Sequence, residues 1–251
     1  MTTDTITATN SYLRDFTGTD SGSAAPAPEW LRALRLVAAE RFAAVGFPTR
    51  RNEEWRFTNI SPIAETPFTL ADETQSQLTA DGLRPFTYEG MGGTQLVFVN
   101  GRFCADLSSP IFPQGVVISS LAEAMAASPE LVEANLGRHA EFTTQAFVAL
   151  NTAALEDGAF VHIKRGTIVD EPIHLLFVSA PSAGPTVSHP RTLIVAEENC
   201  QATIVESYSG AADQVYFTNA VTEVVVAANA VLDHYKVQRE SLKAYHIATM
   251  Q

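Results

Sequence analysis

A weak internal repeat in the second half of the chain is the feature that most constrains its fold. The segments VHIKRG, VAEENC and VVAANA align so that Gly166, Asn199 and Asn229 fall in register, 33 and then 30 residues apart. Glycine and asparagine tolerate a left-handed backbone better than other residues, so they mark a turn at the same place in each unit. Runs rich in Val, Ile and Thr surround these turns, which is typical of β-strands.

A period near 30 residues with strands at equivalent places predicts a stacked solenoid. One coil cannot bury its own inner face, so it must lie on its neighbours, and a parallel β-helix is the natural solution. A jelly roll or cupin barrel is the all-β alternative, but it would need hairpin turns every 8 to 12 residues or so. After Gly101 no Asn-Gly or Asp-Gly pair lies between two strand-like runs. Asp157-Gly158 does not count as a hairpin turn, because a helical pattern precedes it. We therefore favour the solenoid.

The repeat register also tests for a hidden metal site. In a solenoid, histidines at equivalent positions of successive coils would stack and could share a metal ion. The register gives these alignments: His162 with Val195 and Val225, His174 with Ser207 and Val237, and His234 with Ile204 and Glu171. No two histidines coincide, so we predict no metal ligands.

The first half of the chain carries helical and hairpin signals. Apolar residues recur at three- and four-residue spacing between Pro28 and Gly46, which predicts an amphipathic helix. Asn100-Gly101 between two apolar runs predicts a hairpin with a type I′ turn. Ser120 followed three residues later by a glutamate is a capping box, and an apolar stripe over residues 140–155 predicts another helix.

Together these patterns predict a mainly β chain in three parts. Residues 1–27 form a tail or linker, residues 28–150 an N-terminal helical or mixed α and β region, and residues 151–251 the first coils of an incomplete β-helix core. The last run, AYHIATMQ, is strand-like up to Gln251. An open solenoid end exposes unpaired backbone, so we expect either a cover for it or further coils, and self-association of the isolated chain through it.

Charge and composition limit the classes of partner that the chain can bind. Asp and Glu outnumber Lys and Arg 28 to 16, so the net charge is −12, and a chain this acidic repels nucleic acid unless it has a local basic stripe. We find no such stripe. The first 25 residues contain neither a signal-peptide pattern nor an apolar membrane segment. We expect a cytoplasmic protein that binds neither nucleic acid nor membrane.

The two cysteines, Cys104 and Cys200, carry little chemical signal. They match no zinc or CxxC pattern, and they cannot supply the four thiolates of an ordinary iron–sulfur cluster. Each is interpreted as a packed residue, with a ligand role as the alternative. For Cys200 the nearby Glu197, Glu198 and Glu206 would raise the thiol pKa and oppose thiolate formation.

An enzyme is the rival hypothesis. No phosphate loop, GxSxG, HExxH or cupin-type HxH pattern occurs in the sequence. A β-helix carbohydrate lyase or hydrolase would need acidic residues gathered on one exposed face. The only candidates for such a cluster are Glu197, Glu198, Glu206 and Glu223. A solenoid fragment without function is a third hypothesis, and we expect no catalytic, cofactor-binding or metal-binding residues in this chain.

The segment FPTRRNEEWRFTNISPI has two interpretations. In the first, Trp55 and Phe57 pack inward while Arg51 and Glu54 pair at the surface. In the second, the segment is a docking surface for a partner, because Trp and Arg are enriched in interface hot spots.

This segment also resembles a family pattern. It is similar to the P-T-R-(R/K)-x-E-(D/E)-W-R-(Y/F)-T stretch of the SufD branch of the SufB/SufD family, from the SufBCD iron–sulfur cluster assembly complex. Further similar stretches follow in the same order over most of residues 46–251: LVFVNGRF, LNTAALEDGAFVHIKRGTIVDEPIHLLFVS, RTLIVAEENCQATIVESYSG and LDHYKVQRESLKAYHIATMQ.

The resemblance implies a right-handed parallel β-helix behind an N-terminal helical region. It implies a non-enzymatic scaffold subunit that works with SufB and the ATPase SufC and is associated with iron delivery to the nascent cluster. The chain alone would bind no cofactor, and a cluster would be assembled at an interface of the full complex. The family's cysteine and histidine tied to assembly lie beyond the AYHIATMQ region, so the resemblance assigns no site residue here and implies a truncated chain.

Overall fold

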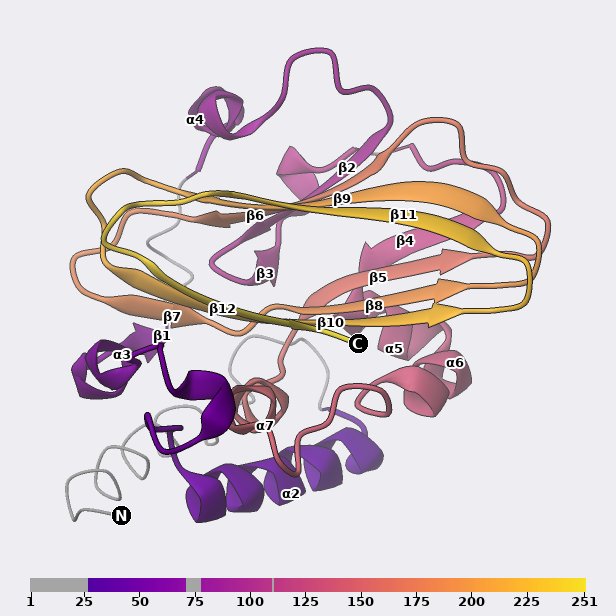
Figure 1. Ribbon diagram of the computed structural model, residues 1–251. Helices are drawn as coiled ribbons and strands as arrows, with labels where there is room; N and C mark the ends of the chain where they lie inside the picture. Colours follow the sequence, from indigo (N-terminus) through magenta and orange to yellow (C-terminus); the bar gives the residue numbers. More distant parts are fainter. Residues whose placement is uncertain (1–26, 71–77, 110) are drawn as a thin grey trace.

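The computed structural model describes residues 27–70, 78–109 and 111–251. Two β-sheets lie face to face, and most of the helices cover the outer side of one of them (Figure 1). Sheet A has the strand order β1-β7-β10-β8-β5-β4, with β12 beside β10, and sheet B has the order β11-β9-β6-β2-β3. The strands are β1 (Thr69–Leu70), β2 (Thr94–Val99), β3 (Arg102–Phe103), β4 (Val116–Ser120), β5 (Gly158–Ile163), β6 (Ile173–Ser179), β7 (Thr186–Ser188), β8 (Arg191–Ala196), β9 (Gln201–Gly210), β10 (Tyr216–Val226), β11 (Val231–Arg239) and β12 (Tyr245–Met250).

The helices of the described residues all precede the solenoid strand β5. The α-helices are α2 (Glu29–Val45), α3 (Ser61–Glu65), α4 (Ala80–Leu83), α5 (Leu121–Ala127), α6 (Pro129–Asn135) and α7 (Ala146–Ala153), and the 3₁₀ turns are η1 (Glu53–Trp55), η3 (Arg84–Phe86) and η4 (Ala105–Leu107). None of the helices in the described residues is long and apolar enough to cross a membrane.

The second half is a parallel β-solenoid, as predicted. Its first coil consists of β5 and β6, its second of β8 and β9, and its third of β10 and β11, and each strand pairs in parallel with the equivalent strand of the next coil. Gly166, Asn199 and Asn229 all have left-handed φ values, of 71°, 58° and 59°. The side-chain amide of Asn229 donates to Asn199 Oδ1 at 3.2 Å, which links two successive turns. The repeat was therefore identified correctly.

One part of the predicted register is wrong by two residues. His174 lies opposite Val205 rather than Ser207, and His234 therefore aligns with Ile173 rather than Glu171. The matched strand ends are joined by nine residues in the first coil (164–172) and by seven in the second (197–203). The longer connection shifts β6 relative to the simple repeat.

Strands from the first half of the chain extend both sheets. Strand β2 pairs in parallel with β6, and β4 pairs antiparallel with β5. The predicted hairpin joins β2 to β3, and Asn100 and Gly101 at its turn have φ values of 53° and 83°, as a type I′ turn requires.

The helical layer packs on sheet A. Helix α2 follows Pro28 and ends before Gly46, whose φ is 65°, and it buries Leu31, Ala38 and Phe42. The capping box at the start of α5 is present. The helix predicted over residues 140–155 is shorter than expected and covers only Ala146–Ala153. The Thr143 amide donates to the Glu141 side chain at 2.6 Å, and such a local bond competes with helix formation.

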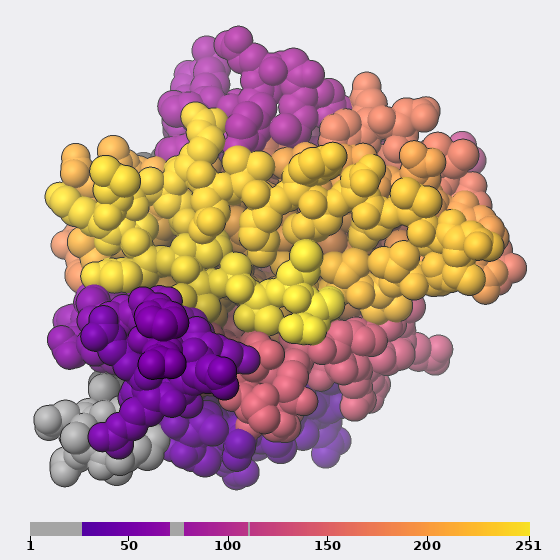
Figure 2. Space-filling view, viewed as in Figure 1, coloured from indigo at the N-terminus to yellow at the C-terminus, as the bar shows by residue number. Residues whose placement is uncertain are grey.

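The C-terminal strands form a broad face of the molecule. In the space-filling view the third coil and β12, in yellow, extend across this face, and an N-terminal segment in purple borders it at the lower left (Figure 2). The predicted strand at AYHIATMQ is β12. Large exposed apolar side chains of this region are Val226, Val231, Tyr235, Leu242 and Met250.

Candidate functional site

The interior of the solenoid changes character from coil to coil. Alternate residues of a strand point to the same face, so every second residue faces the space between the sheets. In the first coil these residues are all apolar: Ala159, Val161, Ile163, Ile173, Leu175 and Phe177. In the third coil the inward positions of β11 that lie beside Ile204, Glu206 and Tyr208 are His234, Lys236 and Gln238. Polar side chains are therefore concentrated where the second coil meets the third.

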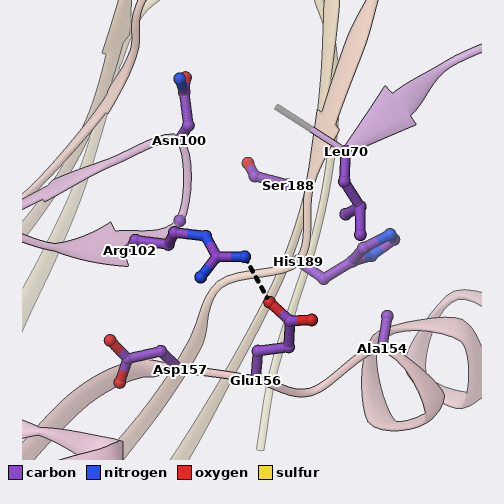
Figure 3. A pocket seen from close by; sticks show the side chains of 9 residues that line it. Leu70, Asn100, Arg102, Ala154, Glu156, Asp157, Ser188 and His189 are labelled. Carbon is purple, nitrogen blue, oxygen red and sulfur yellow. Dashed lines mark hydrogen bonds and ion pairs between the residues drawn. The ribbon is translucent and has the colours of Figure 1, made fainter. Parts of the chain in front are cut away.

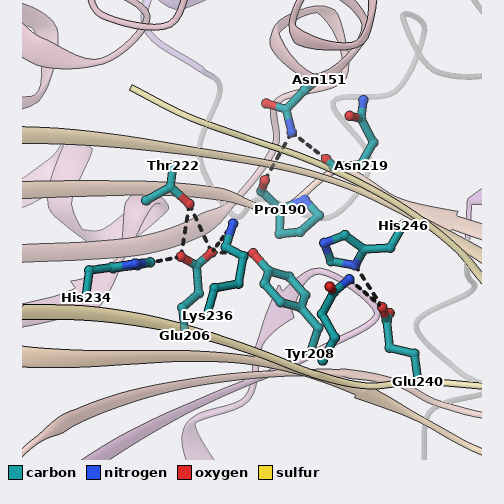
Figure 4. Close-up of polar contacts among 11 residues, drawn as sticks. Asn151, Pro190, Glu206, Tyr208, Asn219, Thr222, His234, Lys236, Glu240 and His246 are labelled. Atoms are coloured by element: carbon teal, nitrogen blue, oxygen red, sulfur yellow. Dashed lines mark hydrogen bonds and ion pairs between the residues drawn. The ribbon is translucent and has the colours of Figure 1, made fainter. Parts of the chain in front are cut away.

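Glu206 is the centre of this polar interior. Its side chain is 0% exposed, and Thr222 Oγ1 donates to it within 3.0 Å of both carboxylate oxygens. His234 Nε2 lies 2.8 Å from Oε2, and Lys236 Nζ lies 3.8 Å from Oε1 (Figure 4). The Tyr208 hydroxyl also donates to Oε1. We call Glu206, Tyr208, Thr222, His234 and Lys236 the Glu206 cluster.

The environment of the Glu206 cluster keeps its central carboxylate charged. Burial acts to raise the pKa of Glu206, but His234, Lys236 and Tyr208 outweigh it and hold the pKa below the usual 4.5. Burial and the neighbouring Glu206 charge place the pKa of Tyr208 well above its usual 10.0, so this phenol stays protonated as a donor.

A second histidine–carboxylate contact lies beside the cluster. The His246 ring is 4.7 Å from the Tyr208 ring in an edge-on arrangement, and its Nδ1 is 2.9 Å from Glu240 Oε2. This contact has the distance of an ion pair but not the geometry of a hydrogen bond, and His246 Nε2 has no hydrogen-bond partner among the described residues. His234 and His246 thus each face a different carboxylate.

A buried ion pair joins the solenoid to the helical layer. Arg191 of β8 and Glu223 of β10 are both 0% exposed, with Nη2 and Oε1 2.6 Å apart. Arg191 Nη1 donates to Asn151 of α7 at 2.9 Å and to Thr152 at 3.2 Å. Burial acts to raise the pKa of Glu223, but Arg191 and backbone donors outweigh it and lower the pKa. Burial lowers the pKa of Arg191, and Glu223 opposes that shift.

Backbone amides complete the surroundings of Glu223. The amides of Gly137 and His139 donate to its two oxygens at 2.8 Å each, and the amide of Ala140 donates at 3.2 Å. Asn151, in turn, donates to the carbonyl oxygens of Pro190 and Asn219 (Figure 4). This network ties α7 and the loop after α6 to sheet A.

A small pocket lies where the β2–β3 turn meets the solenoid (Figure 3). Arg102 and Glu156 form an ion pair of 3.1 Å at its wall. Burial raises the pKa of Asp157 and lowers the pKa of His189 to about 3, so His189 is neutral at pH 7. The backbone amides of Phe103 and Ala122 donate to Asp157 at 3.3 and 3.2 Å.

The two cysteines lie apart from the polar interior. Cys104 packs at the edge of an apolar cluster with Leu83 and Val97, and Cys200 is buried in the solenoid core. The pKa of Cys200 is raised, as predicted, but the main cause is burial, and of the three glutamates expected to act on it only Glu197 contributes. Within residues 27–70, 78–109 and 111–251, no three His, Cys, Asp or Glu side chains are placed to hold a metal ion.

The four carboxylates of the carbohydrate-enzyme hypothesis do not share one exposed face. Glu206 is buried between the two sheets, whereas Glu223 is buried between sheet A and the helical layer. Glu197 and Glu198 lie at a turn between coils, where they pair with His162 at 2.8 Å and Arg165 at 2.8 Å.

His174 has a different environment from the other histidines. Its Nδ1 is 3.1 Å from Gln95 Oε1, and its Nε2 contacts Ser207 Oγ. This resembles a nucleophile and base, but Ser207 is fully buried and burial lowers the pKa of His174 to about 4. The contact fastens neighbouring strands of sheet B.

The first interpretation of the segment FPTRRNEEWRFTNISPI, residues 47–63, is only partly correct. Trp55 packs inward, with its ring 5.2 Å from that of Phe147. Phe57 does not pack: it is 89% exposed. Arg51 and Glu54 form no ion pair in the described part of the chain. The short turn η1 directs Trp55 inward and leaves Phe57, two residues later, outside.

Sequence reasoning did not predict the Glu206 cluster, although the signal was present. The 30-residue register that aligned His234 with Ile204 also places Lys236 beside Glu206. An inward-facing carboxylate stacked on an inward-facing lysine is the pattern that could have been found. Arg191 and Glu223 left no comparable local signal.

Comparison with known proteins agrees with this architecture. A family model described as "SufBD protein N-terminal region" matches residues 6–175. A second, described as "SUF system FeS cluster assembly, SufBD core domain", matches residues 177–251.

Similar curated proteins carry related names. An iron–sulfur cluster assembly SufBD family protein of Synechocystis is 33% identical over 224 residues, which cover 86% of this chain and 49% of the relative. The iron–sulfur cluster assembly protein SufD of Escherichia coli is 27% identical over 218 residues, covering 83% of this chain and 46% of the relative. SufD of Bacillus subtilis is 24% identical over 227 residues, covering 85% and 49%. The chain spans about half the length of these relatives. Because the two family matches follow one another along nearly the whole sequence, the chain belongs to the SufBD family of iron–sulfur cluster assembly proteins.

Proposed function

We propose that this chain acts as a non-catalytic scaffold subunit in iron–sulfur cluster assembly, together with a SufB-type subunit and a SufC-type ATPase. The observation that carries the proposal is the pair of consecutive SufBD family matches over residues 6–175 and 177–251, on a chain that folds as a parallel β-solenoid. The buried charged groups also support a structural role, because the carboxylates of Glu206 and Glu223 are satisfied by other side chains and amides of the same chain.

Iron enters this proposal as cargo. In the proposed role the chain helps to deliver iron to a cluster that forms at an interface with another subunit. The work of the chain is then to hold partners in position, and the reaction energy comes from the ATPase.

The experiment is co-purification of the tagged chain with SufB-type and SufC-type subunits from the same cell. A second tagged version extends past Gln251 if the reading frame continues. We expect the SufB-type and SufC-type subunits to co-purify in stoichiometric amounts with at least one of the two versions. Capture by neither version, or lyase activity of the purified chain, would overturn the scaffold proposal.

A further inference from the structure

Residues 49–59, which we call the Arg–Phe segment, are held in place by hydrogen bonds and by one buried ring. Asn52 Oδ1 accepts the Thr49 amide at 2.9 Å, and the backbone amides of Trp55 and Thr58 close turns at 3.0 and 3.1 Å. The Trp55 ring anchors the segment on Phe147, and Ile60 at its end is buried. The segment is therefore a shaped surface feature with a fixed backbone.

The side chain that this rigid base presents outward is aromatic. Phe57 is 89% exposed, and the Arg56 guanidinium lies 5.4 Å from the centre of its ring. An arginine over an aromatic face is a cation–π contact, which holds the charge beside the ring. Aromatic residues and arginine are enriched at interface hot spots, and here the two types adjoin.

Charged side chains lie close to Phe57 in the sequence. Arg50, Arg51 and Arg56 are exposed and form no ion pair with another described residue. Glu53 and Glu54 lie in the same segment and are also exposed, so the surface is mixed rather than uniformly basic. A guanidinium binds a carboxylate through a planar pair of donors, whereas the adjacent ring offers an apolar contact.

We propose that the Arg–Phe segment docks an acidic segment of another protein, in which a carboxylate lies next to an apolar side chain. The apolar side chain covers Phe57, and the carboxylate binds Arg56 with help from Arg51. The net charge of −12 on the whole chain opposes long-range attraction of an acidic partner. Recognition therefore depends on short-range contact with these residues.

The test is a selection of peptides from a random displayed library on the purified full chain. Binders to the variant Arg51→Glu/Arg56→Glu/Phe57→Ser are removed first. We expect the enriched peptides to carry Asp or Glu beside a large apolar residue. A synthetic copy of the most enriched peptide should bind Phe57→Ala at least about tenfold more weakly than the unchanged chain. Raising the salt concentration should also weaken its binding.

Matched controls separate docking from folding. Arg32→Gln/Leu36→Ala changes an exposed arginine and an exposed leucine on α2 and should leave peptide binding unchanged. Since Phe57 and Arg56 are both exposed, their variants should melt at the temperature of the unchanged chain. Enrichment of basic peptides, of no peptide, or of peptides that bind Phe57→Ala equally well would overturn the proposal. Peptide binding that appears only after residues 1–26 are removed would also overturn the proposal, because these residues of the same chain would then be the partner of the Arg–Phe segment.

Discussion

Glu206 and Glu223 are two carboxylates of the same solenoid, both 0% exposed, that the chain holds in different ways. Glu223 faces the helical layer and is bound by a fully buried arginine and by backbone amides. Glu206 faces the interior between the sheets, and its partners on β11 are the side chains of His234 and Lys236, which are 10% and 22% exposed.

The difference shows that burial alone does not determine what a buried charge does. The donors of Glu223 are the Arg191 side chain and the backbone amides of residues 137–140, so its contacts join the solenoid to the loop after α6. His234 and Lys236, the partners of Glu206, lie on β11, a strand that pairs only with β9 among the described strands. We infer that Glu223 anchors the helical layer, whereas Glu206 stabilises the third coil.

The largest effect should come from Arg191→Met. The change leaves the buried Glu223 without its counter-charge, and breaking a buried ion pair on one side typically costs about 3–5 kcal/mol. Urea unfolding at pH 7 measures the loss. Arg165→Met, which removes a half-exposed ion pair with Glu198, should change the free energy of unfolding by less than about 1 kcal/mol. Equal effects of the two changes would contradict the anchoring role.

A smaller loss is expected for Glu206→Gln. The amide keeps the shape of the side chain but loses the charge opposite His234 and Lys236, at a cost of about 1–3 kcal/mol. Because His234 and Lys236 are both near the solvent, they can regain water, and the cost should stay below that of Arg191→Met. The same urea unfolding experiment tests this, with Glu197→Gln at the exposed turn as the control. A loss larger than that of Arg191→Met would reverse the comparison.

The smallest effect should be a pH dependence that Glu206→Gln removes. The pKa of Glu206 is lowered in the folded chain, so its charge contributes stability above the usual pKa of 4.5. This contribution is lost as the pH falls below 4.5 through the folded pKa. The difference in free energy of unfolding between the unchanged chain and Glu206→Gln should therefore shrink as the pH falls from 5 towards 3. A difference that grows on acidification would show that Glu206 is protonated at neutral pH.

Much of the fold could be predicted because its signals are local or periodic. The turn residues Gly166, Asn199 and Asn229 reported the coil length, and Asn100-Gly101 reported the hairpin. The two-residue error at His174 arose because the spacing of the turn residues does not show how many residues follow the turn before β6 begins.

The candidate site was harder to predict. Phe57 was expected inside because it is apolar, yet the turn at η1 fixes its direction. Arg191 is 40 residues from Asn151 and 32 residues from Glu223 in the sequence, and only the folded sheet brings the three side chains together.

The most direct test of this account is native-state hydrogen exchange of the unchanged chain, Glu206→Gln and Glu223→Gln. We predict that Glu206→Gln speeds exchange in β11 and β12 and leaves α7 unchanged, and that Glu223→Gln speeds exchange in α7 and in residues 137–140. Faster exchange in the same segments for both variants would contradict the account, because the two carboxylates would then stabilise one common unit.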